Sequence, residues 1–382
     1  MLDEVLTLEE RAVVARAAEF AENEVAPNAA RWEWHRHYPL ETIKAACRAN
    51  LHTIELAKEH GGQGLSFSCK LRAFEEIAKH DFAFAFALIN HHNAVARLAR
   101  DGQAPLIARL LPRMIAGQVI GCAGLSEPSV GSDFGALEMS AVKVEDGWKL
   151  NGAKAWITNA VIAGLSVVYA QTDKARGYRG IACFAIEAAR PGFHREKPVE
   201  LHGGHAIGVG GFRLVDYLVP QEAVLHPPGR AFKAALAGIN GARAYVAAMC
   251  CGMLQSSLET AVRYVGQRRT FGKPVLEHQG VRWKLVDAAT DLEAARLLTY
   301  RAARLIDEGG DAVLPAAHAK KFATEMALHR IADCIQAMGA NGLRADYPLA
   351  RHLACAKIAA YTDGSIEMMN ERIGVALPQV FG

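Results

Sequence analysis

The apolar residues of this 382-residue chain change their spacing twice, and this order restricts the folds open to it. From residue 3 to about 120 they recur at helical spacing, as Leu6, Val13, Val14 and Ala17 do. From about 121 to 230 short alternating or β-branched runs replace them, and helical spacing then returns up to residue 382. We therefore predict a mostly helical α+β protein with an N-terminal all-α domain (1–120), a middle β domain (121–230) and a C-terminal helical domain (231–382).

The middle zone carries the clearest strand signals. Alternating apolar residues around Asp146-Gly147 predict a hairpin, and the runs 165–172, 181–187 and 212–220 predict further strands. No helical pattern alternates with them, which argues against a nucleotide-binding parallel sheet. The glycine-rich stretch 203–212 lacks the G-x-G-x-x-G order, and we interpret it as a turn between strands.

Composition excludes several functional classes. Hydrophobic residues make up 51% and charged residues 22%, which suits a packed core and excludes disorder. Lys+Arg 43 against Asp+Glu 40, with no basic run, argues against a nucleic-acid partner. Eight scattered cysteines without a Cys-x-x-Cys pair argue against a disulfide framework and favour a reducing compartment. With neither a signal peptide nor about 18 uninterrupted apolar residues, we expect a cytoplasmic protein outside the membrane.

Two histidine pairs raise the question of a metal site. His35/His37 and His91/His92 lack Cys, Asp or Glu neighbours at metal-site spacing, so we interpret them as packing histidines and predict no metal. A G-x-S-x-G nucleophile motif is also missing from the sequence.

Four segments carry residue types suited to a flat, phosphorylated ligand. In GLSEPSVGSD (124–133) the backbone near Gly131 and the hydroxyls of Ser126 and Ser132 could cradle phosphate or ring carbonyl oxygens. AWITNA (155–160) offers an indole wall and a hydroxyl, and RRTFGKP (268–274) offers arginines that fork onto pyrophosphate. Asp363, a lone acid before a glycine and between two helical patterns, suits a general base.

In order and spacing these segments resemble the signature segments of the acyl-CoA dehydrogenase family, across nearly the whole chain. QAMGANG (336–342) is similar to a late turn of that family, with Ala340 in place of a glycine. The resemblance implies an N-terminal helical domain, a small β-barrel and a C-terminal four-helix bundle, usually assembled as a homotetramer. It also implies an FAD cofactor, an acyl-CoA substrate and an electron-transfer flavoprotein as electron acceptor.

The resemblance also assigns site residues, by position. Those implied to hold FAD within one subunit are Leu125, Ser126, Gly131, Ser132, Trp156, Thr158, Ser365 and Glu367. Those implied to reach FAD from a neighbouring subunit are Arg268, Phe271, Gln279, Gln336 and Gly339. Those implied to contact the acyl-CoA are Ser132, Asn240, Arg243, Thr362 and Gly364. Glu367 departs from the glutamine that relatives often have, which weakens that one assignment.

The decisive departure is Asp363, which stands where the family has the glutamate that removes the substrate α-proton. Some relatives carry that glutamate one helix earlier, and here the position is Ala242. Aspartate is shorter by on the order of 1 Å, and a misplacement of that size can cost about a hundredfold in rate. Family members acting on alicyclic thioesters such as cyclohexanecarboxyl-CoA resemble this chain in having aspartate, and Thr362 replaces an aromatic residue of straight-chain enzymes. We therefore expect a cyclic or branched acyl group.

Three alternatives remain open at this point. A nitroalkane-oxidase-like enzyme also uses aspartate here but has an arginine where this chain has Asn370. A flavin monooxygenase of the same fold would not need Asp363. A non-catalytic partner subunit would only complete the FAD site of another chain.

Overall fold

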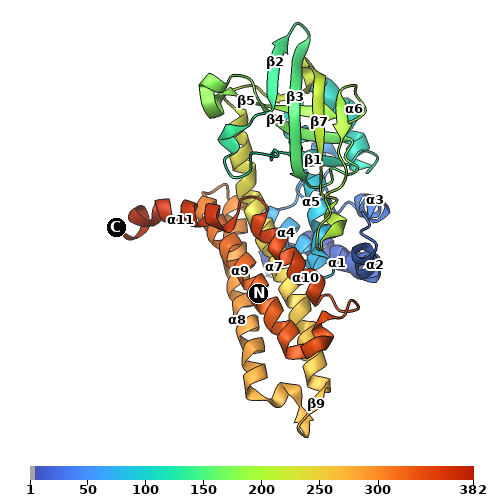
Figure 1. Ribbon diagram of the computed structural model, residues 1–382, viewed down its shortest axis with the longest axis vertical. Coiled ribbons are helices and arrows are strands. Elements are labelled where there is room, and N and C mark those ends of the chain that lie inside the picture. The colour runs from blue at the N-terminus through green and yellow to red at the C-terminus, as the bar shows by residue number, and fades with distance from the viewer. Residues whose placement is uncertain (1–4) are drawn as a thin grey trace.

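The computed structural model describes residues 5–382, in which a β domain sits at one end of an elongated helical body (Figure 1). The prediction of a mostly helical α+β protein in the order helices, sheet, helices is confirmed. The helical body is built from the N-terminal and C-terminal thirds of the chain, which share one apolar core. The sheet and part of the N-terminal helices form a second core.

The N-terminal helices are α1 (Leu8–Phe20), α2 (Ala26–Trp34), α3 (Leu40–Arg48), α4 (Phe67–Ala78), α5 (Phe82–Asp101) and α6 (Ala104–Ile115). A π-helical turn, Ala21–Val25, joins α1 to α2. α1 begins at a capping box, in which Thr7 and Glu10 bond each other's backbone N–H groups. α5 is buried along most of its length because Phe82, Phe84 and Phe86 and the alanines between them leave no polar face. It therefore runs through the interior and can present side chains to both cores.

The β domain contains β1 (Gly121–Gly124), β2 (Ser140–Val144), β3 (Gly147–Ile157), β4 (Leu165–Gln171), β5 (Ile181–Glu187), β6 (Phe193–Arg195), β7 (Gly210–Pro220) and β8 (Val224–His226). These strands pair in the order β6-β7-β3-β2-β4-β5-β8, and β1 pairs with β4 in parallel. The predicted β domain is thus one continuous sheet, in which among the described residues no pairing joins β6 to β8. The predicted hairpin is β2–β3, but its turn lies one residue earlier, at Glu145-Asp146, because Gly147 already pairs with Val144.

The C-terminal helices are α7 (Ala231–Gln267), α8 (Gln279–Asp307), α9 (Val313–Met338), α10 (Leu349–Tyr361) and α11 (Ile366–Phe381). α7 to α10 pack side by side as the bundle, whereas α11 extends away from it (Figure 1). A two-stranded hairpin of β9 (Arg269–Thr270) and β10 (Lys273–Pro274) follows α7, at the opposite end of the bundle from the β domain (Figure 1).

α7 is long and apolar enough to cross a membrane by length and composition alone. However, 61% of its most apolar window is buried inside the protein, against α4, α8 and α9. Its apolar character is thus accounted for by the core that it supports.

Close packing of α7 on α4 gives a stability prediction. A Cβ added at Gly252 would lie 2.2 Å from the carbonyl oxygen of Glu75, so Gly252→Ala must push the two helices apart. We expect it to lower the free energy of unfolding by about 1–3 kcal/mol, measured by urea unfolding followed by circular dichroism. Gly266→Ala on the same helix meets nothing within 4 Å and should raise it by about 0.5–1 kcal/mol. Equal effects of the two substitutions would contradict this packing argument.

Candidate active site

The loop 124–133 is held from beneath by a buried ion pair. The Lys154 ammonium on β3 lies 2.8 Å from Oε1 of Glu127 and donates to the carbonyl of Leu125 at 3.1 Å. The Glu127 carboxylate also accepts from the backbone N–H groups of Glu138 and Met139, at 2.6 and 3.1 Å. Burial lowers the pKa of Lys154 to about 8 although Glu127 opposes this. These contacts therefore fix the position of the loop backbone, and of the exposed Ser132 on it, relative to the sheet.

The segment 155–160 turns out of the sheet where β3 bulges against β7. Trp156 and Asn159 have φ of 61° and 63°, a left-handed conformation that directs the indole outward and leaves it 62% exposed. The Asn159 side chain is fully buried and donates to the carbonyls of Ala87 and Gly121, while the Tyr38 hydroxyl donates to its Oδ1 at 2.9 Å. Asn159 thus fixes the segment that carries the exposed indole, and a flat ring system fits against such a wall.

Asp363 lies in the turn between α10 and α11. Its φ is 52° and that of Gly364 is 99°, so the chain reverses there in two left-handed residues. The Lys320 ammonium on α9, fully buried, donates to the carbonyl of Gly364 and holds the turn. Thr362 donates its hydroxyl to the Ala359 carbonyl at 3.1 Å, turned back into its own helix.

The Asp363 carboxylate faces polar groups from two other helices. The Tyr245 hydroxyl on α7 lies 3.4 Å from its Oδ2, and the charges of Lys320 and Arg243 act on it as well. Burial raises the pKa of Asp363, and Lys320, Tyr245 and Arg243 each oppose that rise. A carboxylate that is largely shielded from water, but whose ionised form is stabilised by neighbouring charges and a hydrogen bond, is suited to proton abstraction.

Asn240 and Arg243, both predicted to contact substrate, lie one turn apart on α7 and bond each other at 3.2 Å. Arg243 is buried, and within the described part of the chain its Nε has no hydrogen-bond partner. An unpartnered buried guanidinium nitrogen costs free energy, so a polar group of a bound molecule can be accommodated there.

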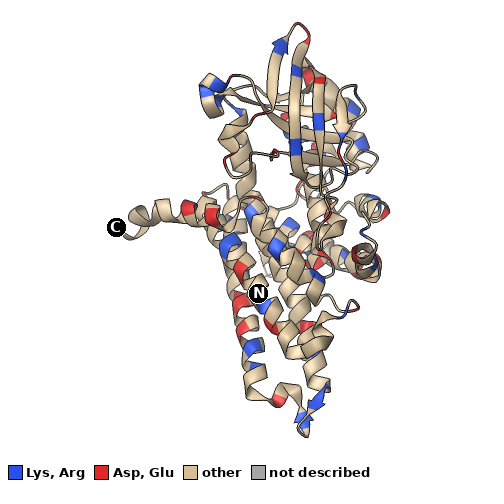
Figure 2. Ribbon diagram, viewed as in Figure 1, with Lys and Arg blue, Asp and Glu red and all other residues tan. Residues whose placement is uncertain are grey.

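The FAD residues predicted to come from a neighbouring subunit lie at the other end of the bundle, and all of them are exposed: Arg268, Phe271, Gln279, Gln336 and Gly339. Figure 2 shows the basic tip at β9–β10, where Phe271 is 96% exposed. From Arg243 to the end of α7 at Gln267 the helix rises about 36 Å, at about 1.5 Å per residue. Within one chain, the predicted FAD residues at the β domain and those near β9–β10 are therefore too far apart for one FAD molecule to contact both groups.

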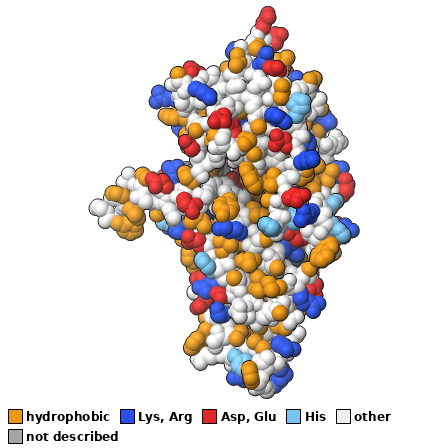
Figure 3. All heavy atoms as spheres, viewed as in Figure 1, with side chains coloured by type: hydrophobic (Ala, Val, Ile, Leu, Met, Phe, Trp, Pro, Cys, Tyr) orange, Lys and Arg blue, Asp and Glu red, His pale blue; other side chains and the backbone are white. Residues whose placement is uncertain are grey.

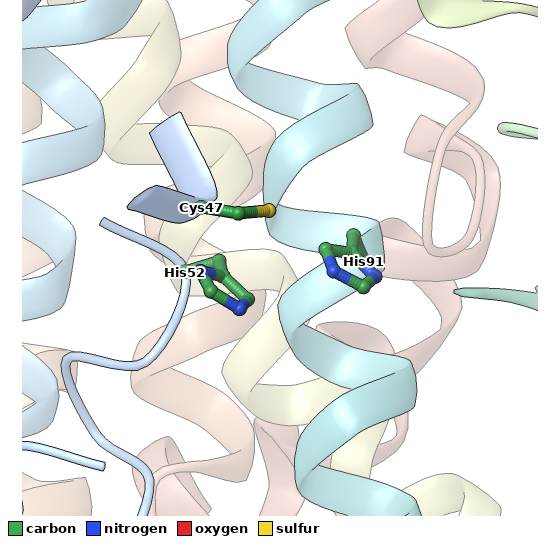
Figure 4. A group of neighbouring side chains, drawn as sticks. All are labelled: Cys47, His52 and His91. Carbon is green, nitrogen blue, oxygen red and sulfur yellow. The ribbon is translucent and has the colours of Figure 1, made fainter. Parts of the chain in front are cut away.

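The histidine pairs were interpreted as packing residues, and His91 behaves as one. Figure 4 shows Cys47 and His52 beside it, a grouping that sequence spacing did not reveal. Both ring nitrogens of His91 are engaged, with the Gly121 N–H at 3.0 Å and the Met114 carbonyl at 3.1 Å, and its ring stacks on that of His52. Burial lowers the pKa of His91 to about 4 and raises that of Cys47 to about 12, so neutral side chains pack here. The absence of a metal stays a prediction.

His91 and its neighbour also do not approach the base. His92 bonds the His52 carbonyl at 2.7 Å and lies beside the Lys70–Glu55 ion pair. The residue of α5 that reaches toward the base is Asn93, through Tyr245.

Comparison with known proteins identifies the family. Residues 7–118, 122–216 and 229–377 match the N-terminal, middle and C-terminal domains of acyl-CoA dehydrogenases. The chain belongs to the acyl-CoA dehydrogenase family. It is an FAD-dependent oxidoreductase, as the sequence resemblance implied.

Individual relatives agree. The chain is 34% identical to isovaleryl-CoA dehydrogenase of Oryza sativa (93% of this chain, 88% of the relative). It is 32% identical to the short-chain acyl-CoA dehydrogenase of Clostridium acetobutylicum (96% and 97%). Its fold is similar to butyryl-CoA dehydrogenase of Megasphaera elsdenii, with a TM-score of 0.94, 32% identity and coverage of 98% and 99%.

Several site residues escaped the sequence analysis. The apolar spacing of the helices that carry Tyr245, Asn93 and Lys320 does not mark these residues as functional. Only the packing of the helices brings them to Asp363. Asn159 lies inside the motif 155–160 and Lys154 directly precedes it, but the sequence points only to Trp156 and Thr158 in that motif. A lysine at an inward position of a strand was the available signal for Lys154, because a buried charge requires a partner.

The Lys154–Glu127 pair yields a test. Lys154→Met leaves the Glu127 carboxylate buried without its cation, so we expect the free energy of unfolding to fall by about 3–5 kcal/mol. The loop 124–133 should also loosen, and purified protein should retain less FAD per chain, measured by flavin absorbance. Lys143→Met is the control, since that exposed lysine on β2 bonds the exposed Gln221 side chain and lies 5.2 Å from the centroid of the Trp148 ring, and its loss should change stability by about 0.5–1 kcal/mol at most. A Lys154→Met protein as stable and as yellow as the parent would contradict the assignment.

Proposed function

We propose that Asp363 is the base that removes the α-proton of an acyl-CoA thioester whose acyl group is compact, either branched or alicyclic. The observation that carries this is the position of the Asp363 carboxylate, in a left-handed turn between α10 and α11 that Lys320 holds. Ala242, where some relatives place their glutamate, offers no ionisable group.

The side chains around Asp363 support this chemistry. Lys320 and Arg243 favour its ionised form, and Tyr245 occupies Oδ2, so Oδ1 is the oxygen free to accept a proton. The backbone N–H of Asp363 and the exposed loop 124–133 are suited to binding the thioester and orienting its α-carbon. When bound, FAD would supply the acceptor for the hydride of the β-carbon. Trp156 and Thr158 would lie against the flavin, and the Gly131–Ser132 backbone would lie along it.

The size of the acyl group is argued from Asp363 and Thr362. The aspartate arm is short, so the α-carbon must come about 1 Å closer to the α10–α11 turn than with glutamate. Thr362 carries no ring and turns its hydroxyl back to Ala359, which leaves lateral room beside the base. The isovaleryl and short/branched-chain relatives act on small acyl groups by name, which is consistent with a compact substrate.

An anaerobic panel tests this proposal. Purified holoenzyme is mixed with isovaleryl-, butyryl-, cyclohexanecarboxyl- and palmitoyl-CoA, and bleaching of the flavin near 450 nm is followed by stopped flow. We expect the branched or cyclic thioesters to bleach the flavin fastest, and Asp363→Asn to slow the bleaching by about 10²–10⁴-fold.

Other outcomes would overturn it. If the flavin of the Asp363→Asn variant is bleached as fast as that of the parent, Asp363 is not the base. If palmitoyl-CoA bleaches the flavin fastest, the acyl group of the substrate is not compact. Peroxide formation from nitroethane would favour the oxidase alternative, and a chain unable to bind added FAD would favour the partner-subunit alternative.

We further propose an electron-transfer flavoprotein as electron acceptor and a reducing, cytoplasmic location. A chain from a structure described as electron transferring flavoprotein of Acidaminococcus fermentans is similar to this one, at 33% identity and a TM-score of 0.94. All eight cysteines are free and buried, which is consistent with a reducing compartment.

A homo-oligomer, a tetramer by resemblance, is proposed from the incomplete FAD site. Arg268, Phe271 and Gln279 lie at or beyond the far end of α7, whereas Trp156 lies in the β domain at the other end of the subunit, which supports a second copy bringing them to the flavin. α11 also projects from the body with an apolar tip (Figure 3), where Val375, Val380 and Phe381 are exposed. An apolar patch of this kind is typical of a subunit contact.

Mixing two inactive variants tests the shared site. Co-expressed Asp363→Asn and Arg268→Ala chains should recover about a quarter of the parent activity, because half of random pairs are mixed and one of their two sites is intact. As a control, Asp363→Asn co-expressed with the double variant should recover none. No recovery in the first mixture, with both chains folded and co-purifying, would contradict a site shared between subunits.

A further inference from the structure

We propose that Tyr245 is a positioning residue that holds the shortened base, with Asn93 orienting its hydroxyl from the opposite side. The inference rests on the proposed function, because it assigns a role to Tyr245 only if Asp363 is the base. It adds a residue that no sequence motif of the chain marks.

The three side chains come from three separate parts of the fold. Asn93 on α5 donates through Nδ2 to the Tyr245 hydroxyl at 3.1 Å, and that hydroxyl donates to Oδ2 of Asp363 at 3.4 Å. Tyr245 is 3% exposed, and its ring packs against Phe86 of α5 with 6.5 Å between ring centroids. The phenol is thus fixed at both its ring and its oxygen.

This fixing matters because an aspartate lacks the reach of a glutamate. A short carboxylate that rotates freely would spend part of its time with neither oxygen aimed at the α-carbon. A donor on Oδ2 selects one rotation and leaves Oδ1 free. The Asn93 donor also polarises the phenol and so strengthens its bond to the carboxylate.

Tyr245 remains a donor over the working pH range. Burial and the neighbouring Asp363 charge raise its pKa well above the ordinary value of a phenol. Lys320 acts differently, since its ammonium holds the Gly364 carbonyl and sets the turn rather than the carboxylate rotation. Tyr245 therefore controls orientation, and Lys320 controls where the base stands.

The groups that face Asp363 fix the sign of the pH effect. Tyr245 and Arg243 approach from α7 and Lys320 from α9, and all three favour the ionised carboxylate. On α11, Arg372 acts on Arg243 and Glu367 acts on Lys320. Removing the Tyr245 hydroxyl takes away one stabiliser of the charged form, so the pKa of Asp363 rises and the acidic limb of the rate profile moves to higher pH.

The test uses Tyr245→Phe holoenzyme, with its ring kept and its hydroxyl removed. We expect the rate of flavin reduction at the high-pH plateau to fall about 10–100-fold, with the acidic limb shifted upward and the Kd for acyl-CoA nearly unchanged. Asn93→Leu should act in the same direction but less, and the double variant should match Tyr245→Phe alone because both act through one hydroxyl.

A matched control separates this from loss of a buried hydrogen bond in general. Tyr300 on α8 donates to the buried Glu75 carboxylate at 2.6 Å, and among the described residues no hydrogen bond links it to the Asp363 turn. Tyr300→Phe should lower stability but leave the reduction rate and the acidic limb in place.

The outcomes distinguish the two assignments. If Asp363→Asn abolishes reduction while Tyr245→Phe leaves both the plateau rate and the limb unchanged, the positioning role is wrong and the base assignment stands. If Asp363→Asn reduces flavin as fast as the parent, both are wrong. A Tyr245→Phe effect equalled by Tyr300→Phe would also overturn the positioning role.

Discussion

The buried ammonium of Lys320 is the contact on which the reactive end of this enzyme depends. It has no exposed surface, and burial lowers its pKa to about 8. Its acceptor is a backbone carbonyl, that of Gly364, in the turn where Asp363 takes a left-handed conformation. Such a conformation costs free energy for any residue with a Cβ, and it persists where surrounding contacts determine it. Lys320 supplies that contact, and its positive charge also favours the ionised form of Asp363.

A buried lysine also supports the second irregular segment of the candidate site, the loop 124–133. Lys154, equally buried, joins the loop 124–133 to β3 through Glu127 and the Leu125 carbonyl. In both places a buried lysine donates to the backbone or a side chain of an irregular segment. This contact fixes the position of a segment that has no regular secondary structure of its own. Loops that bind cofactor or substrate need such support, because their backbone has no ladder or helix to satisfy it.

α7 relates these parts to one another. It carries Asn240, Arg243 and Tyr245 near the β domain and ends at the exposed hairpin of Arg269–Thr270 and Lys273–Pro274. Its length separates the two sets of residues proposed to bind FAD, which lie at opposite ends of one subunit. A helix of that length is rigid on this scale, so folding within one chain cannot bring the sets together, and assembly between chains can.

The sequence by itself determined the order of helices, sheet and helices, since apolar spacing is set by whether side chains repeat every 3.6 or every two residues. It also determined the motifs, and through them the family, FAD and Asp363 as the single acid in its turn. Only the tertiary structure decided that Tyr245, Asn93 and Lys320 meet at that acid, that Cys47 and His52 lie against His91, and that the sheet stays open between β6 and β8. Those side-chain contacts join residues 39 to 152 positions apart, and local propensity carries no information at that range because they depend on how whole elements pack.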